Sequence, residues 1–415
     1  MFSRSFFTAA LLASASIVLP AQAVTLADAE GSYHALQQFY NQSIGLWIPY
    51  ADPYGHRPGG GTRPTVCARS VNSGGVCANE VDVPGLTVIA DLAAIDGGVK
   101  AQSESVFGNT FREAQLYNLQ MQKVVGPDYL PHTYYGHHWP YFPQGWHRPE
   151  PHQTNGFLNS YYDDEGWWAL AWIAAYDVTG NWQYLATAES IFEDIKAAAG
   201  TTPCGGLIWW DKSHTYVNAI ANELFLDVAA HLANRGGNRA TYYLSWAQKQ
   251  WAAFKASGMI NDQNTINDGL NITTCKNNGG TVWSYNQGVI LGGLTELSKA
   301  TRDGSYITTA KQIADAAIAN LTVNGILHDV CEPNCGADGS QFKGVFARNL
   351  QILQQASPEA RYATFLQDNA NSIWANDREG QDELSLIWSG PFIQPANAST
   401  QSSAMDTLVG ALATS

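Results

Sequence analysis

From residue 31 onward, apolar side chains recur at intervals of three and four residues, with polar residues between them. This spacing places the apolar positions on one face of an α-helix. Gly, Asn, Asp and Pro separate the segments, and the alternating Val and Ile runs that predict β-strands are nearly absent. The pattern predicts an all-α protein with helices at 31–43, 84–96, 103–123, 161–178, 182–199, 216–235, 240–257, 285–301, 305–321, 342–356, 359–376 and 400–413.

A weak internal repeat groups these twelve helices in pairs. Similar segments start at Tyr184, Tyr243, Tyr306 and Phe365, at intervals of 59, 63 and 59 residues, which is enough for two helices and their loops. One such hairpin cannot bury its apolar stripe alone and must stack on its neighbours. Six hairpins predict a closed ring of six inner and six outer helices; the alternative is an open superhelical array.

Two segments interrupt this rhythm. Residues 51–83 are rich in Gly and Pro, and residues 126–155 carry five His among Tyr, Trp and Pro. We expect both insertions over one end of the ring, as part of a cleft wall, because long aromatic loops are usually functional. The His spacing matches no zinc motif, so the prediction is no metal and no cofactor. No linker divides residues 24–415, which predicts a single domain.

The N-terminal residues predict secretion. Met1–Ala23 begins with Arg4, continues through an apolar run and closes with Ala21-Gln22-Ala23, the pattern of a signal peptide. No later apolar stretch has the roughly 20 residues that span a bilayer, so we expect no membrane anchor.

The six Cys of an exported chain predict disulfides, for which 15 pairings exist. Proximity favours Cys67 with Cys77 and Cys331 with Cys335, and leaves Cys204 for Cys275. N-glycosylation sequons, typical of eukaryotic secretion, begin at Asn41, Asn271, Asn320 and Asn397.

Composition favours a neutral substrate. With 36 acidic and 22 basic residues the net charge is −14, and no basic run is available to neutralise a nucleic acid. The chain has 12% aromatic but only 14% charged residues. Flat apolar faces together with uncharged hydrogen-bonding groups suit sugar rings.

Three acidic residues, Asp163, Asp164 and Glu165, stand at the head of an aromatic helix. Acids are also common in a first helical turn without any catalytic role, because the helix dipole stabilises them. Adjacent carboxylates can lie about 5 to 5.5 Å apart, the separation of a retaining glycosidase. Since like charges at that distance repel, one group stays protonated while its neighbour is ionised. The residues therefore form a candidate nucleophile and acid pair.

Six motifs, in order, resemble glycoside hydrolase family 76, which includes retaining endo-α-1,6-mannanases and fungal cell-wall proteins. They lie at 163–168, 204–209, 218–224, 267–270, 283–288 and 342–349. The resemblance implies an (α/α)6 barrel with Asp163 as nucleophile and Asp164 as general acid/base. It also implies that the partner is α-1,6-mannan or a manno-oligosaccharide.

The same resemblance implies that Asp268 contacts a mannose unit, although an Asn-Asp-Gly turn is the alternative reading of this position. Polar residues near the predicted helix ends are further substrate-binding candidates: Asn222, Tyr285, Asn286, Gln287, Lys343 and Arg348. Their alternative role is to tie helices together or to form ion pairs. Candidate stacking platforms are Trp139, Trp146, Trp167, Trp168, Trp209 and Trp283, of which two or three are expected at the site.

We therefore expect a secreted monomer that cleaves α-1,6-mannosidic links inside a mannan chain. Three alternatives remain: a transglycosidase, a non-catalytic mannan-binding protein, and a lyase, which the acidic net charge disfavours. The first 130 residues depart from the family pattern, and Val217 stands where family members often have Lys. The two insertions leave open whether the site is an open groove or a blocked, exo-type pocket.

Overall fold

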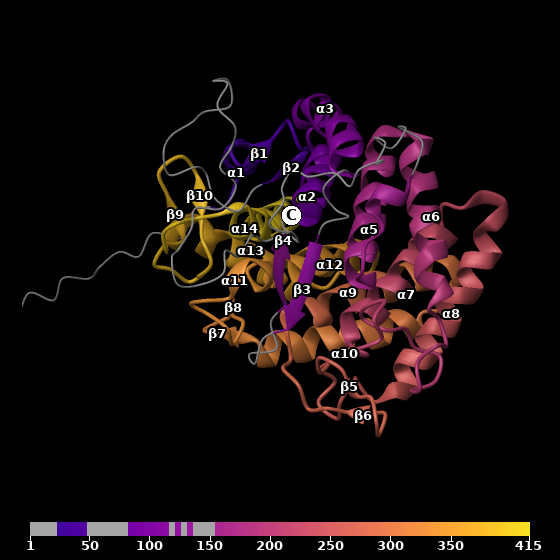
Figure 1. The fold of residues 1–415 in the computed structure, drawn as a ribbon. Helices are drawn as coiled ribbons and strands as arrows, with labels where there is room; N and C mark the ends of the chain where they lie inside the picture. Colours follow the sequence, from indigo (N-terminus) through magenta and orange to yellow (C-terminus); the bar gives the residue numbers. More distant parts are fainter. Residues whose placement is uncertain (1–22, 48–81, 116–120, 126–130, 136–153) are drawn as a thin grey trace, which may run out of the picture.

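The computed structural model describes residues 23–47, 82–115, 121–125, 131–135 and 154–415, and Figure 1 shows their arrangement. Six helices form an inner ring in which each contacts the next and the last contacts the first. They are α2 (Asp82–Ile95), α5 (Tyr162–Thr179), α7 (Ala219–Ala233), α9 (Ser284–Thr301), α12 (Phe342–Ala356) and α14 (Ala398–Ala413).

Six further helices surround this ring. They are α1 (Leu26–Gln37), α3 (Gly97–Glu113), α6 (Trp182–Ala197), α8 (Ala240–Ser257), α10 (Ser305–Asn320) and α13 (Ala360–Asn376). Each packs against one or two inner helices. The predicted all-α class and the closed (α/α)6 barrel are confirmed, and the open array is wrong.

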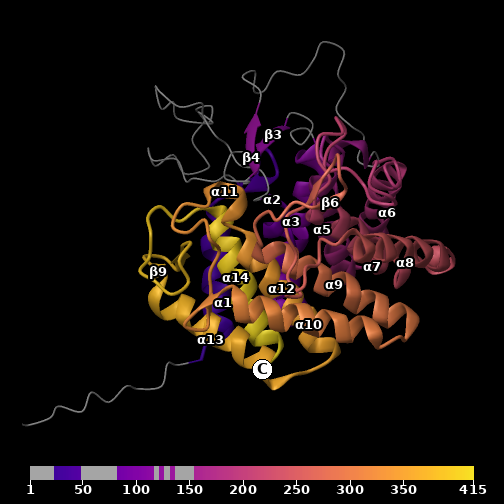
Figure 2. The same ribbon diagram turned by 90° about the horizontal axis from the view of Figure 1, so that it is seen from below.

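Inner and outer helices alternate along the chain, so all inner helices begin at one end of the barrel. We call this end the mouth and the opposite end the base. Short elements lie between the helices: β1 (Tyr40–Asn41), β2 (Leu46–Trp47), β3 (Met121–Val125), β4 (Pro131–Tyr135), η1 (Thr154–Phe157), η2 (Gly237–Arg239), β5 (Leu270–Asn271), β6 (Lys276–Asn277), β7 (Thr322–Val323), β8 (Ile326–Leu327), α11 (Gly336–Gly339), β9 (Arg378–Glu379) and β10 (Glu383–Leu384). In Figure 2 the β3–β4 hairpin and the C-terminus lie at opposite ends of the molecule.

Two predicted helices had the wrong bounds. The helix predicted at 31–43 begins earlier, at Leu26, because Thr25 and Asp28 form a capping box, and it ends at Gln37. Residues 40–41 instead form the strand β1. The helix predicted at 103–123 begins at Gly97, where Asp96 accepts hydrogen bonds from two backbone N–H groups, and it ends at Glu113. Residues 121–125 instead form β3, which pairs with β4 in an antiparallel hairpin.

Neighbouring inner helices approach closely at glycines near the mouth. A Cβ at Gly288 of α9 would lie 2.6 Å from the Cα of Phe346 in α12, and one at Gly344 would lie 2.5 Å from the Cα of Ser403 in α14. No side chain fits at these distances, so glycine is required for the contact.

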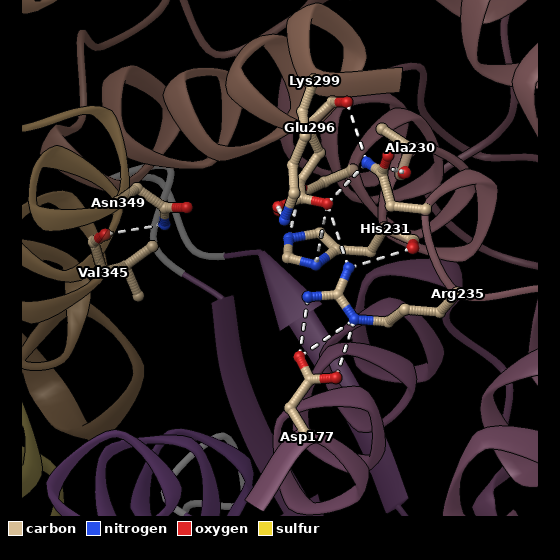
Figure 3. A network of polar contacts seen from close by, with 10 residues as sticks. Asp177, Ala230, His231, Arg235, Glu296, Lys299, Val345 and Asn349 are labelled. Carbon is tan, nitrogen blue, oxygen red and sulfur yellow. Dashed lines mark hydrogen bonds and ion pairs between the residues drawn. The ribbon is translucent and has the colours of Figure 1, made fainter. Parts of the chain in front are cut away.

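A network of charged side chains joins three inner helices at the base, as Figure 3 shows. Arg235, just after α7, binds Asp177 of α5 at 2.7 Å and Glu296 of α9 at 3.0 Å. His231 lies between Asp227, at 3.2 Å, and Glu296, at 4.0 Å. These pairs fix α5, α7 and α9 relative to one another.

Two disulfides lie in the described residues, Cys204–Cys275 and Cys331–Cys335. Both predicted pairings are confirmed; the predicted Cys67–Cys77 pair lies outside the described residues. Cys275 belongs to the loop between β5 and β6, and its partner follows α6. The Cys204–Cys275 bond therefore joins two of the loops near the barrel mouth.

Replacing Cys204 and Cys275 together with Ser is expected to lower the free energy of unfolding by about 2–4 kcal/mol, because the bond closes a long loop of the unfolded chain. Its sequence separation is 71 residues, whereas that of Cys331–Cys335 is 4. The double replacement of Cys331 and Cys335 is the matched control and should cost much less. Denaturant unfolding measures both, and equal losses would contradict the expectation.

Candidate active site

A short backbone pairing builds the site at the start of α5. Tyr161 and Asp211 form an antiparallel bridge. The N–H of Tyr162 donates to the carbonyl of Trp210 at 2.9 Å, and the N–H of Lys212 donates to the carbonyl of Ser160 at 2.9 Å. The pairing brings residues 210–212 beside the first turn of α5, which carries the three acids.

Asp163 and Asp164 are both nearly buried, with 3% and 4% of their surface exposed. The indole Nε1 of Trp210 donates to Oδ2 of Asp163 at 2.9 Å. The amide Nδ2 of Asn159 donates to Oδ2 of Asp164 at 2.8 Å. Each aspartate thus receives a hydrogen bond from a different neutral side chain, within a setting of low exposure where charge interactions are strong.

Glu165, the third acid, anchors the loop in front of the helix. Its side chain is fully buried; it binds Lys212 at 2.7 Å and accepts the N–H of Asn159 at 3.0 Å. Burial raises the pKa of Glu165, and Lys212 opposes this by stabilising the charged form. Lys212 also binds Asp194 of α6 at 2.7 Å. These contacts give Glu165 a role in holding the loop.

Asp268, in the loop that precedes β5, approaches Asp163. Its carbonyl accepts the N–H of Ala219 at 2.7 Å, which fixes it at the start of α7. The hydroxyl of Tyr216 donates to its Oδ2 at 2.7 Å. Burial raises the pKa of Asp268 to about 6, Tyr216 opposes the shift, and the charge of Asp163 adds to it. The structure thus brings the predicted residue Asp268 close to Asp163.

Glu223 is a buried acid that sequence reasoning missed. It lies in the second turn of α7 with 0% exposure, and neither carboxyl oxygen has a hydrogen-bond partner among the described residues. Burial raises its pKa well above the ordinary value, and the charges of Asp268 and Asp227 act in the same direction. Burial and these two neighbouring carboxylates thus all favour the neutral form of Glu223.

Asn222 and Gln287 each hold a loop through two hydrogen bonds to the backbone of one loop residue. The N–H of Ile208 donates to Oδ1 of Asn222 at 2.9 Å, and Nδ2 of Asn222 donates to the carbonyl of Ile208 at 3.1 Å. Gln287 makes the equivalent pair with Ile266, at 2.8 and 2.9 Å. A carboxamide offers one donor side and one acceptor side, as a peptide group does. The alternative role, tying a loop to an inner helix, is the one that these contacts favour.

The other four candidates lie in different surroundings. Tyr285 stacks on Phe342 with ring centroids 3.8 Å apart. The amide of Asn286 is fully buried and makes no hydrogen bond within the described residues. Lys343 and Arg348 are buried and paired, Lys343 with Glu332 at 2.7 Å and Arg348 with Asp406 at 3.0 Å. Because both cations already have carboxylate partners, these contacts favour the ion-pair role.

Trp210 and Asn159 are the neighbours of the aspartates that sequence reasoning missed. The candidate platform Trp209 precedes Trp210, but its ring stacks on His214 with centroids 4.9 Å apart. Trp167, Trp168 and Trp283 are each at most 5% exposed. Trp139, Trp146 and four of the five His of 126–155 lie outside the described residues, as do residues 51–81 of the insertion predicted at 51–83. The fifth, His132, lies in β4, where its backbone is paired with Val124. Among described residues, no three His, Cys, Asp or Glu side chains are grouped to hold a metal.

The described chain is a helical toroid with buried acids at the start of the inner helix α5. Residues 146–415 match the sequence profile of Glycosyl hydrolase family 76. Since the match covers well over half of the 415 residues, the chain belongs to this family.

Relatives and solved structures agree with this assignment. Mannan endo-1,6-alpha-mannosidase DCW1 of Candida albicans is 29% identical over 252 residues, which are 54% of this chain and 55% of the relative. Mannan endo-1,6-alpha-mannosidase DFG5 of Saccharomyces cerevisiae is 28% identical over 217 residues, 48% of this chain and 47% of the relative. The chain thus spans about half the length of these curated relatives.

Among solved structures, the alpha-1,6-mannanase of Salegentibacter sp. HEL1_6 superimposes with a TM-score of 0.69 at 19% identity, covering 94% of this chain and 99% of that one. Dfg5 from Chaetomium thermophilum, solved with glucosamine, gives 0.65 at 18% identity, covering 94% and 89%. At such identities the similarity establishes the fold alone.

Proposed function

We propose that this protein is a retaining glycoside hydrolase that cleaves α-1,6-mannosidic links within mannan. Asp163 attacks C1 of the mannose unit, and Asp164 protonates the departing 6-oxygen. Water then hydrolyses the mannosyl-enzyme ester, with Asp164 as the base. The observation that carries the proposal is the adjacent, nearly buried Asp163 and Asp164, each with its own neutral donor, in a chain of this family.

Two comparisons support the substrate class. The curated relatives are named mannan endo-1,6-alpha-mannosidases. A solved structure of the Salegentibacter enzyme is an inactive variant with two adjacent Asp exchanged for Asn, in complex with alpha-1,6-mannotriose. The variant of that protein without both carboxyls is inactive, and we propose that Asp163 and Asp164 are the catalytic pair here.

Secretion is part of the proposal and rests on the N-terminal residues and the disulfides. The Cys204–Cys275 and Cys331–Cys335 bonds suit an oxidising compartment. In the described part of the chain, every helix is too short or too polar to cross a bilayer.

Incubation with linear α-1,6-mannan tests the activity. We expect steady shortening of the polymer from internal cuts, and product that is released first as the α-anomer, because two displacements restore the configuration. Chromatography follows the chain length, and NMR follows the anomer. Products longer than the starting mannan would indicate transglycosylation instead. Release of the β-anomer would exclude the double displacement, and binding without turnover would exclude an enzyme.

A further inference from the structure

We propose that Trp210 and Asn159 are positioning residues, each of which orients one of the two adjacent aspartates. The inference rests on the proposed function and deepens it. It starts from two hydrogen bonds: Trp210 donates to Asp163 at 2.9 Å, and Asn159 donates to Asp164 at 2.8 Å.

Trp210 is a donor that cannot change direction. An indole N–H donates and never accepts, so Oδ2 of Asp163 is an acceptor whenever this contact is made. Trp210 is 6% exposed, and its ring packs on Tyr161 with centroids 5.0 Å apart. Its backbone carbonyl accepts the N–H of Tyr162. Contacts of the ring and of the backbone thus both hold Trp210 beside the start of α5.

Asn159 has a defined orientation as well. The backbone N–H of Tyr161 donates to its Oδ1 at 2.7 Å, so the other end of the amide must be the NH2 group. That group donates to Oδ2 of Asp164. In a protonated carboxyl the carbonyl oxygen is the stronger acceptor, so this contact favours Oδ2 as the carbonyl oxygen and Oδ1 as the oxygen that carries the proton. Glu165 keeps this arrangement by accepting the N–H of Asn159.

Several other titratable groups surround the pair. Asp268, whose carbonyl is bonded to the start of α7, acts on Asp163 and Glu223, while Glu165, Lys212 and Asp194 form a chain of ion pairs. Replacing Trp210 or Asn159 with a neutral residue leaves all these charges in place. A change in the ionisation of Asp163 or Asp164 would then come from the lost donor.

The first test compares pH profiles of kcat/KM with α-1,6-mannotetraose as substrate. A donor stabilises the carboxylate, so its loss raises the pKa of the group that it contacts. The acidic limb of the profile reports ionisation of the nucleophile, so Trp210→Phe should move this limb to higher pH by about one unit and should not move the basic limb. The basic limb reports loss of the proton from the acid, so Asn159→Ser should move that limb to higher pH by a similar amount and should not move the acidic limb.

The neighbouring residue provides a matched control. The indole N–H of Trp209 has no hydrogen-bond partner among the described residues, so Trp209→Phe should leave both limbs at their wild-type pH. Movement of both limbs by the same amount in either variant would overturn the inference. A crossed result, with Trp210→Phe moving the basic limb, would overturn it too, because the roles of the aspartates would be reversed.

The second test does not depend on activity. In protein with isotope-labelled tryptophan, the indole resonance of Trp210 is identified by its absence in Trp210→Phe. It should shift with pH in the wild type, and this shift should vanish in Asp163→Asn. An unchanged titration in Asp163→Asn, or none in the wild type, would overturn the contact. If this resonance shifts with pH but the protein cleaves no mannan, the proposed function is wrong, while the contact between Trp210 and Asp163 is supported.

Discussion

The Asp163→Asn variant is expected to lose at least about 10⁴-fold in the turnover of α-1,6-mannan, because an amide cannot form the covalent mannosyl ester. Asp164→Asn should lose about 10² to 10⁴-fold, since it removes only the assistance to the leaving group. An activated aryl α-mannoside separates the two roles. Its leaving group needs no proton, so the first step should recover in Asp164→Asn and stay absent in Asp163→Asn.

Rapid-quench measurement of the released phenol checks this expectation, with thermal unfolding as the control for folding. Both variants should fold, because asparagine has nearly the same shape and both positions keep a neutral donor nearby. Recovery in Asp163→Asn in place of Asp164→Asn would reverse the assignment. Full mannan turnover by both variants would exclude these residues as the catalytic pair.

The second large effect is on stability. Burial acts to raise the pKa of Glu296, but His231, Arg235 and Lys299 outweigh it and hold this pKa at about 2, below its ordinary 4.5. A difference of this size corresponds to about 3 kcal/mol of stability at neutral pH. Glu296→Gln removes the charge and should lower the free energy of unfolding by about that amount, because it leaves Arg235 and His231 with one carboxylate partner fewer.

The stabilisation by Glu296 should decrease as the pH falls. A carboxyl with a depressed pKa stabilises the fold above its unfolded pKa, and that contribution disappears as the pH falls through the folded pKa. The difference between wild type and Glu296→Gln should therefore be full at pH 6 and shrink from about pH 4.5 toward 2. Urea unfolding measures it, and a difference independent of pH would contradict the electrostatic origin.

An exposed pair is the matched control for this network. Asp315 binds Arg361 at 2.8 Å, but about half of each side chain is exposed. Asp315→Asn should change the free energy of unfolding by less than about 1 kcal/mol, because water screens the pair and both ends remain solvated when it is broken. A loss as large as that of Glu296→Gln would show that burial does not govern these ion pairs.

Much of the barrel was predictable because helix periodicity and repeat length are properties of local sequence. The helices predicted at 240–257 and 342–356 match α8 and α12 residue for residue. The pattern failed where polar caps at Thr25 and Asp96 extend a helix beyond its apolar stripe. It also failed at 121–125, where pairing with residues 131–135 produces strands.

The candidate site was predictable in part. The acids of one helical turn stand together in the sequence, and the resemblance pointed to Asp268, which lies beside Asp163. For Asn222, Gln287, Lys343 and Arg348, residue type suggested sugar contacts, whereas the structure gives each a protein partner. Residue type states what a side chain can bind, but only its position decides what it meets.

By itself, the sequence determined the helices, their pairing into six hairpins and the adjacent acids, because each depends on residues close together in the chain. Only the tertiary structure decided which groups surround those acids. Trp210 lies 47 positions from Asp163, and Asp268 comes from the loop before β5, which is hydrogen-bonded to the start of α7. Closing the ring brings these distant segments together, and the burial that follows sets their hydrogen bonds and their charges.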